Sequence, residues 1–367
     1  MAGMERDERA VLAALHSIRG IGNRTLWMIS QYFGSFTECW HARPDRLYSS
    51  PLSSELVQDI LALKKQVEPG EYLLSILSKG IEVITWQDDM YPSALRNISN
   101  PPYVFYCQGQ IEATTKPCIS IVGSRRATNY GRTVARKLAE QLAGYGITVV
   151  SGLARGIDSE AHYGALVNGQ TIAVLANGLN IVYPPENKRL VEQITASGLV
   201  ISEFPLNTNP EQRNFPMRNR IISGLSRGTV VVEAQRKSGA LITADYALEQ
   251  GRDVFAVPGG IFAAGSKGTH GLIKQGAKLV ESAADILEEY GLAAVRVERP
   301  APEPAGDEGR VFLALSCDAP LTAEELVMKV NLPAPVVTYI LLQLELKGLV
   351  VKLDGWRYVR LPGRETG

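Results

Sequence analysis

The arrangement of apolar and polar positions divides the chain into three zones. Up to about residue 70, apolar residues recur at helical spacing without runs of β-branched residues, which predicts a region built of helices. From about residue 80 to residue 290, short apolar runs alternate with helical patterns. The runs that we interpret as strands are Ile119–Val122, Thr148–Ser151, Thr171–Leu175, Leu199–Ser202, Thr229–Glu233 and Asp253–Val257. This alternation predicts a doubly wound α/β domain, with helices on both faces of a parallel sheet.

A proline-rich segment separates the sheet zone from the last part of the chain. Pro300, Pro302 and Pro304 restrict the backbone and remove hydrogen-bond donors, so we expect an extended linker there. The elements expected after it are helices over Arg310–Ser316, Leu321–Val330 and Ala334–Lys347, and a hairpin over Leu349–Val359 that turns at Asp354-Gly355. The parts that we expect are a helical domain over residues 1–75, a sheet domain over 76–290, a linker over 291–307 and a small domain over 308–367.

The chain carries no net charge, but its charges are unevenly distributed. Its 367 residues include 38 Lys and Arg and 38 Asp and Glu, so it is not basic throughout, and any nucleic-acid site must come from local charge. Residues 113–139 hold six Lys or Arg and no acid, and residues 212–232 hold four Arg and no acid. Residues 281–309 hold eight acids against two Arg, so we expect an acidic tether beside a concentrated cationic site.

Cysteine and histidine are sparse and scattered. The four Cys and four His include no C-x-x-C pair and no cluster with metal-ligand spacing, so we expect no metal site, and we expect no cofactor. The first nine residues hold three acids and no apolar signal region, and no apolar run approaches the ~18 residues of a membrane-spanning helix. The composition therefore predicts a soluble protein of the reducing cytoplasm.

The first basic stretch crosses the end of a predicted strand, where ligands bind in parallel sheets. Gly123, Ser124 and Arg125 follow the strand directly, and the N–H groups at the start of the next helix favour an anion. Gly123 would let a phosphate approach the backbone, and Arg125 could pair with phosphate oxygens. Arg132, Arg136 and Lys137 of this stretch are interpreted as a solvated helix face.

The second basic stretch joins cations to an aromatic ring. Pro216 suits the first turn of a helix, on which Arg218, Asn219 and Arg220 would present donors. Phe215 offers a ring on which a base can stack, and the combination is typical of sites for single-stranded nucleic acid. A single Phe is, however, more often part of a core.

A third segment at the same predicted edge, Ser238 and Gly239, precedes a helix. It is either a simple N-cap or a further set of free N–H groups. No G-x-G-x-x-G follows a strand, no P-loop ends in Gly-Lys-Ser/Thr, and no G-x-S-x-G elbow occurs. Acids at strand ends are few, namely Asp158, Glu203 and Glu233. A hydrolase or dehydrogenase therefore has weak support.

Four blocks of the middle zone are specific in combination. They are Gly123–Arg125, Ser151–Asp158, Phe215–Ile222 and Gly251–Gly259. Together they closely resemble the DNA-processing protein A family, also called DprA or Smf. The resemblance implies an extended Rossmann-like domain that binds single-stranded DNA without strong sequence preference and has no enzymatic activity. It also implies a homodimer that loads the recombinase RecA onto DNA during natural transformation.

The resemblance also implies roles for individual residues. Gly123–Arg125 would hold a DNA phosphate, and Phe215 takes the place of the aromatic residue ahead of the Arg-Asn-Arg block. The family often has a lysine where this chain has Pro185, and Lys188 is the candidate to replace it. The surface for dimerisation and for RecA maps to Thr269–Leu279, including His270 and Leu279.

The flanking zones fit the same resemblance. Residues 18–24 and the helical pattern after them resemble a helix-hairpin-helix, whose Gly-Ile-Gly turn can hold a DNA phosphate, although the family's N-terminal module is sterile-alpha-motif-like and often does not bind DNA. The order of elements after residue 308 resembles a winged helix. Such domains bind either duplex DNA or proteins, and the predicted recognition helix has few cations beyond Lys347.

Two other functions use a similar fold. Pro258-Gly259-Gly260 with Gly268-Thr269 resembles a block of nucleoside-monophosphate phosphoribohydrolases, but the acid that should follow the Thr is absent until Glu281. Fold likeness alone does not establish that activity. The second alternative is a nucleotide-binding sensor that uses the same sheet edge for a small ligand.

Overall fold

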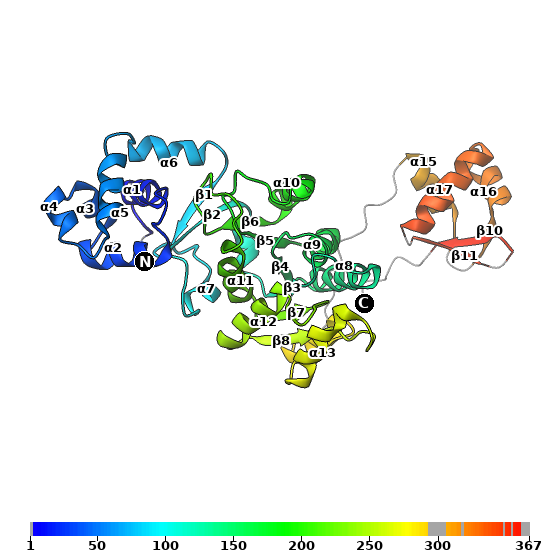
Figure 1. The fold of residues 1–367 in the computed structure, drawn as a ribbon. Coiled ribbons are helices and arrows are strands. Elements are labelled where there is room, and N and C mark those ends of the chain that lie inside the picture. Colours follow the sequence, from blue (N-terminus) through cyan, green and yellow to red (C-terminus); the bar gives the residue numbers. More distant parts are fainter. Residues whose placement is uncertain (1–2, 293–305, 317–318, 348, 354, 361–367) are drawn as a thin grey trace. The chain divides into compact units, whose positions relative to one another are not determined.

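The computed structural model describes residues 3–292, 306–316, 319–347, 349–353 and 355–360 (Figure 1). Contacts divide the chain into two compact units, Met1–Val297 and Glu298–Gly367. The expected linker lies mainly outside the described residues, as does Asp354 of the expected hairpin turn.

A nine-stranded, mostly parallel sheet forms the centre of the first unit. Its order is β1-β2-β6-β5-β4-β3-β7-β8-β9, in which β1–β2 and β2–β6 pair antiparallel and the other neighbours pair parallel. The strands are β1 Glu82–Thr85, β2 Val104–Gly109, β3 Cys118–Val122, β4 Thr148–Ser151, β5 Thr171–Leu175, β6 Leu199–Ser202, β7 Gly228–Val231, β8 Asp253–Ala256 and β9 Lys278–Leu279. All six predicted strands are confirmed, whereas β1, β2 and β9 were not predicted from the sequence.

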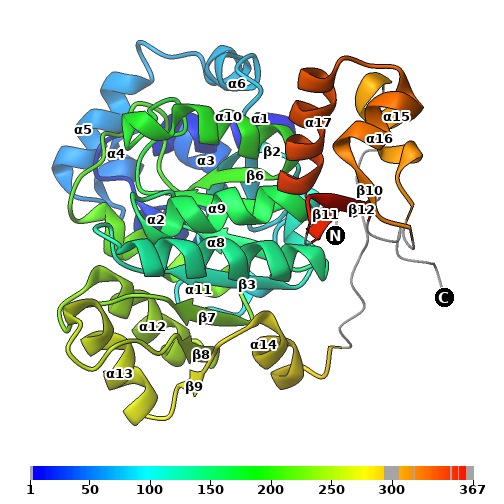
Figure 2. The ribbon, with the colours of Figure 1, turned by 90° about the vertical axis from the view of Figure 1, so that its right-hand side faces the viewer.

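Helices cover both faces of this sheet, as a doubly wound fold requires. Ile119 and Ile121 of β3 pack with α8 and α9, whereas Cys118 and Val122 point to the opposite face, toward α11 and α12. Figure 2 shows α8 and α9 lying side by side across one face. The helices after β3 are α8 Asn129–Gly144, α9 Ile157–Asn168, α10 Lys188–Ser197, α11 Asn214–Leu225, α12 Gly239–Glu249, α13 Lys267–Lys274 and α14 Ala283–Glu289, with short 3₁₀ turns η2 Pro185–Asn187 and η3 Ala264–Ser266.

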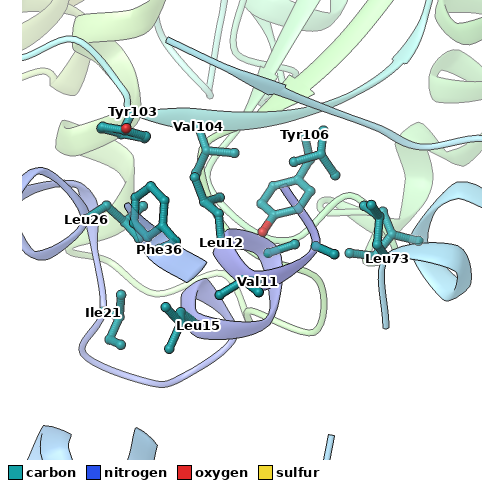
Figure 3. Packing of buried hydrophobic residues seen from close by; sticks show 14 of the residues in the cluster. Val11, Leu12, Leu15, Ile21, Leu26, Phe36, Leu73, Tyr103, Val104 and Tyr106 are labelled. Atoms are coloured by element: carbon teal, nitrogen blue, oxygen red, sulfur yellow. The ribbon is translucent and has the colours of Figure 1, made fainter. Parts of the chain in front are cut away.

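The N-terminal helices share a hydrophobic core with the antiparallel side of the sheet. Tyr103, Val104 and Tyr106, at and before β2, meet Leu12 of α1 and Phe36 of α3 (Figure 3). The helical pattern predicted for this region is confirmed. Its elements are α1 Arg6–His16, α2 Asn23–Phe33, α3 Phe36–His41, α4 Pro44–Tyr48, α5 Ser54–Leu63 and α6 Pro69–Leu77, and the connections on either side of β2 contain α7 Ser93–Arg96 and the 3₁₀ turn η1 Ile111–Thr114.

The second unit has the order of elements expected of a winged helix. Its strands form a small antiparallel sheet, β10-β12-β11. The elements are α15 Gly306–Ala314, β10 Leu321–Thr322, α16 Ala323–Val330, α17 Ala334–Leu346, β11 Val350–Leu353 and β12 Arg357–Arg360. In the described part of the chain, no single helix is long and apolar enough to cross a membrane. The pair α16 and α17 has the length and apolar composition of a membrane span when taken together, but the two helices are bent by 112° relative to each other.

Candidate nucleic-acid interface

A cleft opens where the strand order of the sheet reverses. From β3 the chain builds outward through β4, β5 and β6, and it then returns to place β7 on the other side of β3. The segments that leave β3 and β7 therefore diverge, which is the usual location of a ligand site in such sheets. The Phe215 cleft, of about 340 Å³, lies here between Gly123–Arg126, the first turns of α11 and the start of α12.

The segment after β3 is tied to the end of β7. The Ser124 amide donates to the Glu233 carbonyl oxygen over 2.8 Å, and the Thr128 amide donates to Glu233 Oε2 over 2.9 Å. A Cβ at Gly123 would lie 2.6 Å from Cγ1 of Ile157. Packing inside the protein therefore already requires glycine at this position, independently of the phosphate approach that the sequence suggested.

Arg125 and Phe215 form the exposed centre of the cleft. The guanidinium carbon of Arg125 lies 4.5 Å from the centroid of the half-buried Phe215 ring, within the range of a cation–π contact. The Tyr183 ring lies 6.1 Å from Phe215. Arg125 is exposed, and no described carboxylate forms an ion pair with it. Its guanidinium donors therefore face solvent beside an aromatic surface.

Arg218 lines the same cleft but is almost fully buried. Its Nη1 donates to the carbonyl oxygens of Gly152, over 2.6 Å, and of Val174. A Cβ at Gly152 would lie 2.6 Å from the guanidinium, so only glycine lets this arginine approach the backbone. Burial, followed by repulsion from Arg125, lowers the pKa of Arg218 to about 10, and Asp158 opposes the shift. Arg218 thus connects the ends of β4 and β5 and lies 5.9 Å from the Phe215 centroid.

Asp158 supplies a buried negative charge near Arg218. Its Oδ2 accepts from the amides of Gly152, over 3.2 Å, and of Ala154, over 3.4 Å. Burial raises the pKa of Asp158, and the charge of Arg218 acts in the opposite direction. These contacts hold the loop after β4, so Asp158 has a structural role in this loop.

The structure corrects the expectation that Arg220 presents a donor to the cleft. Arg220 is only 5% exposed and forms a buried ion pair with Glu203. Burial raises the pKa of Glu203, and the attraction of Arg220 counteracts it. Because residues two apart point to different sides of a helix, Arg218 reaches the cleft while Arg220 turns into the protein.

Of the other residues predicted for DNA binding, three line the cleft and Lys188 lies outside it. Ser238 caps α12 by accepting from the Ala240 amide over 3.3 Å, and Asn219 Nδ2 donates to the Gly239 carbonyl oxygen over 3.3 Å. Ser238, Gly239 and Asn219 all line the cleft. Lys188 is exposed at the start of α10 and does not line it.

The two residues predicted for dimerisation lie on separate elements. His270 is in α13, where its Nε2 lies 3.1 Å from the Gly259 carbonyl oxygen. Leu279 is 44% exposed on β9, at the edge of the sheet. An exposed leucine on an edge strand is compatible with a protein contact.

Three further residues of the cleft were not predicted from the sequence. Arg126, Gln235 and Lys237 also line the Phe215 cleft. Lys237 directly precedes the N-cap Ser238, so a search for cations next to helix starts at the strand ends would have found it. Among the described residues, no group of three or more His, Cys, Asp or Glu is arranged to hold a metal ion.

Comparison with known families accounts for most of the chain. The family model described as DNA recombination-mediator protein A matches residues 82–291, and the model described as the DprA winged helix domain matches residues 296–355. The first match contains every strand of the large sheet and all residues of the Phe215 cleft.

Individual relatives give the same result. The chain is 35% identical to "Protein Smf" of Synechocystis over 97% of this chain and 100% of that protein. It is similar to the structure of DNA processing protein A from Streptococcus pneumoniae, with a TM-score of 0.66, 35% identity, and 78% of this chain and 99% of that one covered. The Helicobacter pylori structure, whose title concerns single-stranded DNA binding by DNA processing protein A, gives a TM-score of 0.52 and 29% identity over 57% of this chain and 95% of that one. The chain belongs to the DNA recombination-mediator protein A family, known as DprA or Smf.

Proposed function

We propose that this protein binds single-stranded DNA without strong sequence preference through the Phe215 cleft. The observation that carries the proposal is the exposed Arg125 guanidinium, which lies 4.5 Å from the Phe215 ring centroid without a carboxylate partner among the described residues. The single-stranded DNA named for the Helicobacter pylori relative supports the same ligand.

Arg125 and Phe215 would contact different parts of the DNA. Arg125 can pair with phosphate oxygens, and Phe215 can stack on any base, because every base has an aromatic face. Arg218 and Asp158 act as positioning residues that hold the surrounding loops. Contacts to phosphate and to base faces carry no base-edge information, so binding should tolerate any sequence.

We further propose that the protein is a cytoplasmic homodimer that loads RecA onto single-stranded DNA during natural transformation. Family membership supports this role, and the exposed Leu279 on β9 is compatible with the expected contact surface. Light scattering on a Leu279→Glu variant should show a monomer, because a buried charge opposes association. A variant that stays dimeric would exclude Leu279 from the interface.

The primary test is Arg125→Ala in a fluorescence titration with oligo-dT. Loss of a charge-assisted phosphate contact should weaken binding by about tenfold or more, equivalent to ~1.5–3 kcal/mol. Arg132→Ala is the matched control, because Arg132 is exposed on α8, lies 3.8 Å from Glu160 and does not line the cleft. Equal affinities of the Arg125 and Arg132 variants would reject the site.

The alternative functions can be tested with one small ligand. A phosphoribohydrolase would release free base from AMP, and a nucleotide sensor would bind AMP without cleaving it. We expect no cleavage, since the strand-end acids Glu203 and Glu233 are engaged by Arg220 and by Thr128. Tight binding of AMP without cleavage would favour the sensor. Chromatography of the reaction detects cleavage, and equilibrium dialysis with AMP detects binding.

A further inference from the structure

A smaller hollow adjoins the Phe215 cleft at the ends of β4 and β5. Four residues line both of them, namely Arg125, Ala154, Phe215 and Arg218. The lining of the smaller one, which we call the Arg155 hollow, adds Arg155 from the loop after β4, and Tyr183 and Pro184 from the loop after β5. The segment Thr269–Leu279, which is expected at the dimer contact, contributes no lining residue, so the Arg155 hollow stays open in a homodimer of that kind.

Packing between two loops fixes the backbone of Arg155 beside that of Arg125. The Ile157 amide donates to the Ser124 carbonyl oxygen over 3.2 Å, which ties the start of α9 to the loop after β3. Gly156 has a φ of +78°, and a Cβ on it would lie 2.9 Å from the Arg125 carbonyl oxygen. The residue next to Arg155 therefore packs against the backbone of Arg125, and both arginines reach the Arg155 hollow from fixed neighbouring loops.

A carboxylate occupies the Arg155 guanidinium in this structure. Arg155 Nε forms an ion pair with Oε1 of Glu186, in η2, and Arg155 Nη2 donates to Glu186 Oε2 over 3.2 Å. The two side chains are 62% and 50% exposed, and the hydrogen bond from Arg155 lowers the pKa of Glu186, so the carboxylate is charged at neutral pH. An ion pair this open to water contributes little to stability, so another anion can replace Glu186 at small cost.

The 3₁₀ turn that carries Glu186 has a separate anchor. Asn187, the next residue, is buried, and its Nδ2 donates to the Leu153 carbonyl oxygen and to Ser159 Oγ, each over 2.9 Å. These bonds hold η2 against the loop after β4 and the start of α9, whether or not Glu186 pairs with Arg155. The ion pair is therefore dispensable for the local fold, and Arg155 can exchange partners.

We infer that Arg155 is a second phosphate-binding residue, and that Glu186 neutralises it until a DNA phosphate displaces the carboxylate. The inference rests on the proposed function and extends it from one phosphate contact to two. Phosphate oxygens accept the same paired N–H bonds from a guanidinium as a carboxylate does, so the position of Glu186 suits a phosphate as well. A single strand that crosses the Phe215 ring toward Tyr183 passes both Arg125 and Arg155.

The test is a double-mutant cycle on the full chain. Fluorescence anisotropy with oligo-dT of about 20 nucleotides, enough to cover both hollows, gives the affinity of Arg155→Ala, of Glu186→Gln and of the double variant. Arg46→Ala and Glu38→Gln are the matched controls. These two residues also form an exposed ion pair, at 50% and 63%, and they line neither hollow.

The inference predicts effects of opposite sign for the two partners. Arg155→Ala should weaken binding about tenfold, as expected for the loss of a charge-assisted hydrogen bond, and make the slope of log K against log salt shallower by about 0.7. Glu186→Gln should strengthen binding about threefold, because the phosphate no longer has to displace a carboxylate. In the Arg155→Ala background, Glu186→Gln should lose most of this gain, and the controls should change neither affinity nor slope.

The outcomes separate this inference from the proposed function. Weaker binding by Glu186→Gln would overturn it, because the ion pair would then serve to hold the loops. Equal gains from Glu186→Gln with and without Arg155 would also overturn it, since they would reflect a general change of charge. If Arg125→Ala weakens binding and Arg155→Ala does not, the Phe215 cleft stands and Arg155 is no phosphate contact. Absence of binding by the wild type rejects the proposed function and the inference together.

Discussion

The helical region at the start of the chain and the helical domain at its end are attached to the rest of the protein in different ways. The first shares one hydrophobic core with the large sheet, in which α1, α2 and α3 pack against β2. The second has a core drawn from residues 311–358 alone. The two regions, which the apolar pattern sets apart from the sheet zone alike, thus differ in cooperativity. The first should unfold with the sheet, and the second should unfold by itself.

Polar contacts reinforce the N-terminal attachment. Asn23 Oδ1 accepts from the Tyr103 amide over 2.7 Å, and Arg9 Nη2 lies 2.6 Å from Asp88 Oδ1. Asp88 Oδ2 in turn accepts from the Thr85 amide over 2.7 Å. The helices are therefore tied to both ends of the connection between β1 and β2, so they cannot separate from the sheet without leaving polar groups unpaired.

The largest effect is expected for Tyr106→Ala. Tyr106 is fully buried between β2 and α1, and its ring stacks on His16 with centroids 5.8 Å apart. Removing it should lower the free energy of unfolding of the first unit by about 3–5 kcal/mol, as for other large-to-small core changes. Urea unfolding followed by circular dichroism should show the loss in the main transition.

Tyr358→Ala is the matched control, because Tyr358 belongs to the core of the C-terminal unit. It should weaken only the transition of that unit. A separate early transition of Tyr106→Ala, with a loss of helical signal that matches residues 6–77, would contradict the shared core. The N-terminal helices would then unfold independently of the sheet.

A smaller, pH-dependent effect is expected from His16 at the same junction. Burial lowers the pKa of His16 to about 4, so the folded ring stays neutral while the unfolded ring gains a proton below about pH 6.5. Its contribution to stability is therefore complete above pH 6.5 and is lost as the pH falls toward 4. Between pH 6.5 and pH 5 the loss should be about 1.6 kcal/mol.

The variant His16→Gln isolates this contribution. Its unfolding free energy should depend about half as steeply on pH between 6.5 and 5, because His162, whose pKa burial lowers to about 3, keeps a similar contribution. His41→Gln, at an exposed position of α3, is the control and should leave the slope unchanged. A His16→Gln slope equal to that of the control would contradict the buried neutral ring.

Apolar periodicity predicted the parts of the fold that follow a regular alternation. The parallel strands β3 to β8 are buried on both faces, so each reads as a continuous apolar run between helices. β1 and β2 lie on an antiparallel extension without an intervening long helix, and β9 has only two residues, so that alternation could not reveal them. The shared core of α1 and β2 depends on contacts between distant segments, which periodicity does not encode.

The candidate site was predictable to a similar extent. Strand-end position and residue type identified Arg125 and Phe215, which the structure brings together. Position and residue type could not distinguish Arg218 from Arg220, because both are arginines on one turn of the helix. Only the fold brings Glu203 next to Arg220 as an ion-pair partner. The packing reason for glycine at position 123 could not be predicted either, since the close contact comes from Ile157 across the loop.

The smallest effect is expected when the C-terminal unit is removed by ending the chain at residue 292. Helix α17 contains no Lys or Arg, and Tyr339 and Leu342 are exposed on it, at 63% and 51%. Two cations of this unit are engaged, since Lys347 Nζ lies 2.6 Å from Glu308 Oε1 and Lys352 Nζ lies 3.3 Å from the Trp356 ring centroid. A face of this kind adds little attraction for phosphates, so oligo-dT affinity should stay within about twofold and the main unfolding transition should not move. A loss beyond about tenfold would instead place a DNA contact in the C-terminal unit, and a shifted main transition would mean that the two units are coupled as the N-terminal helices are coupled to the sheet.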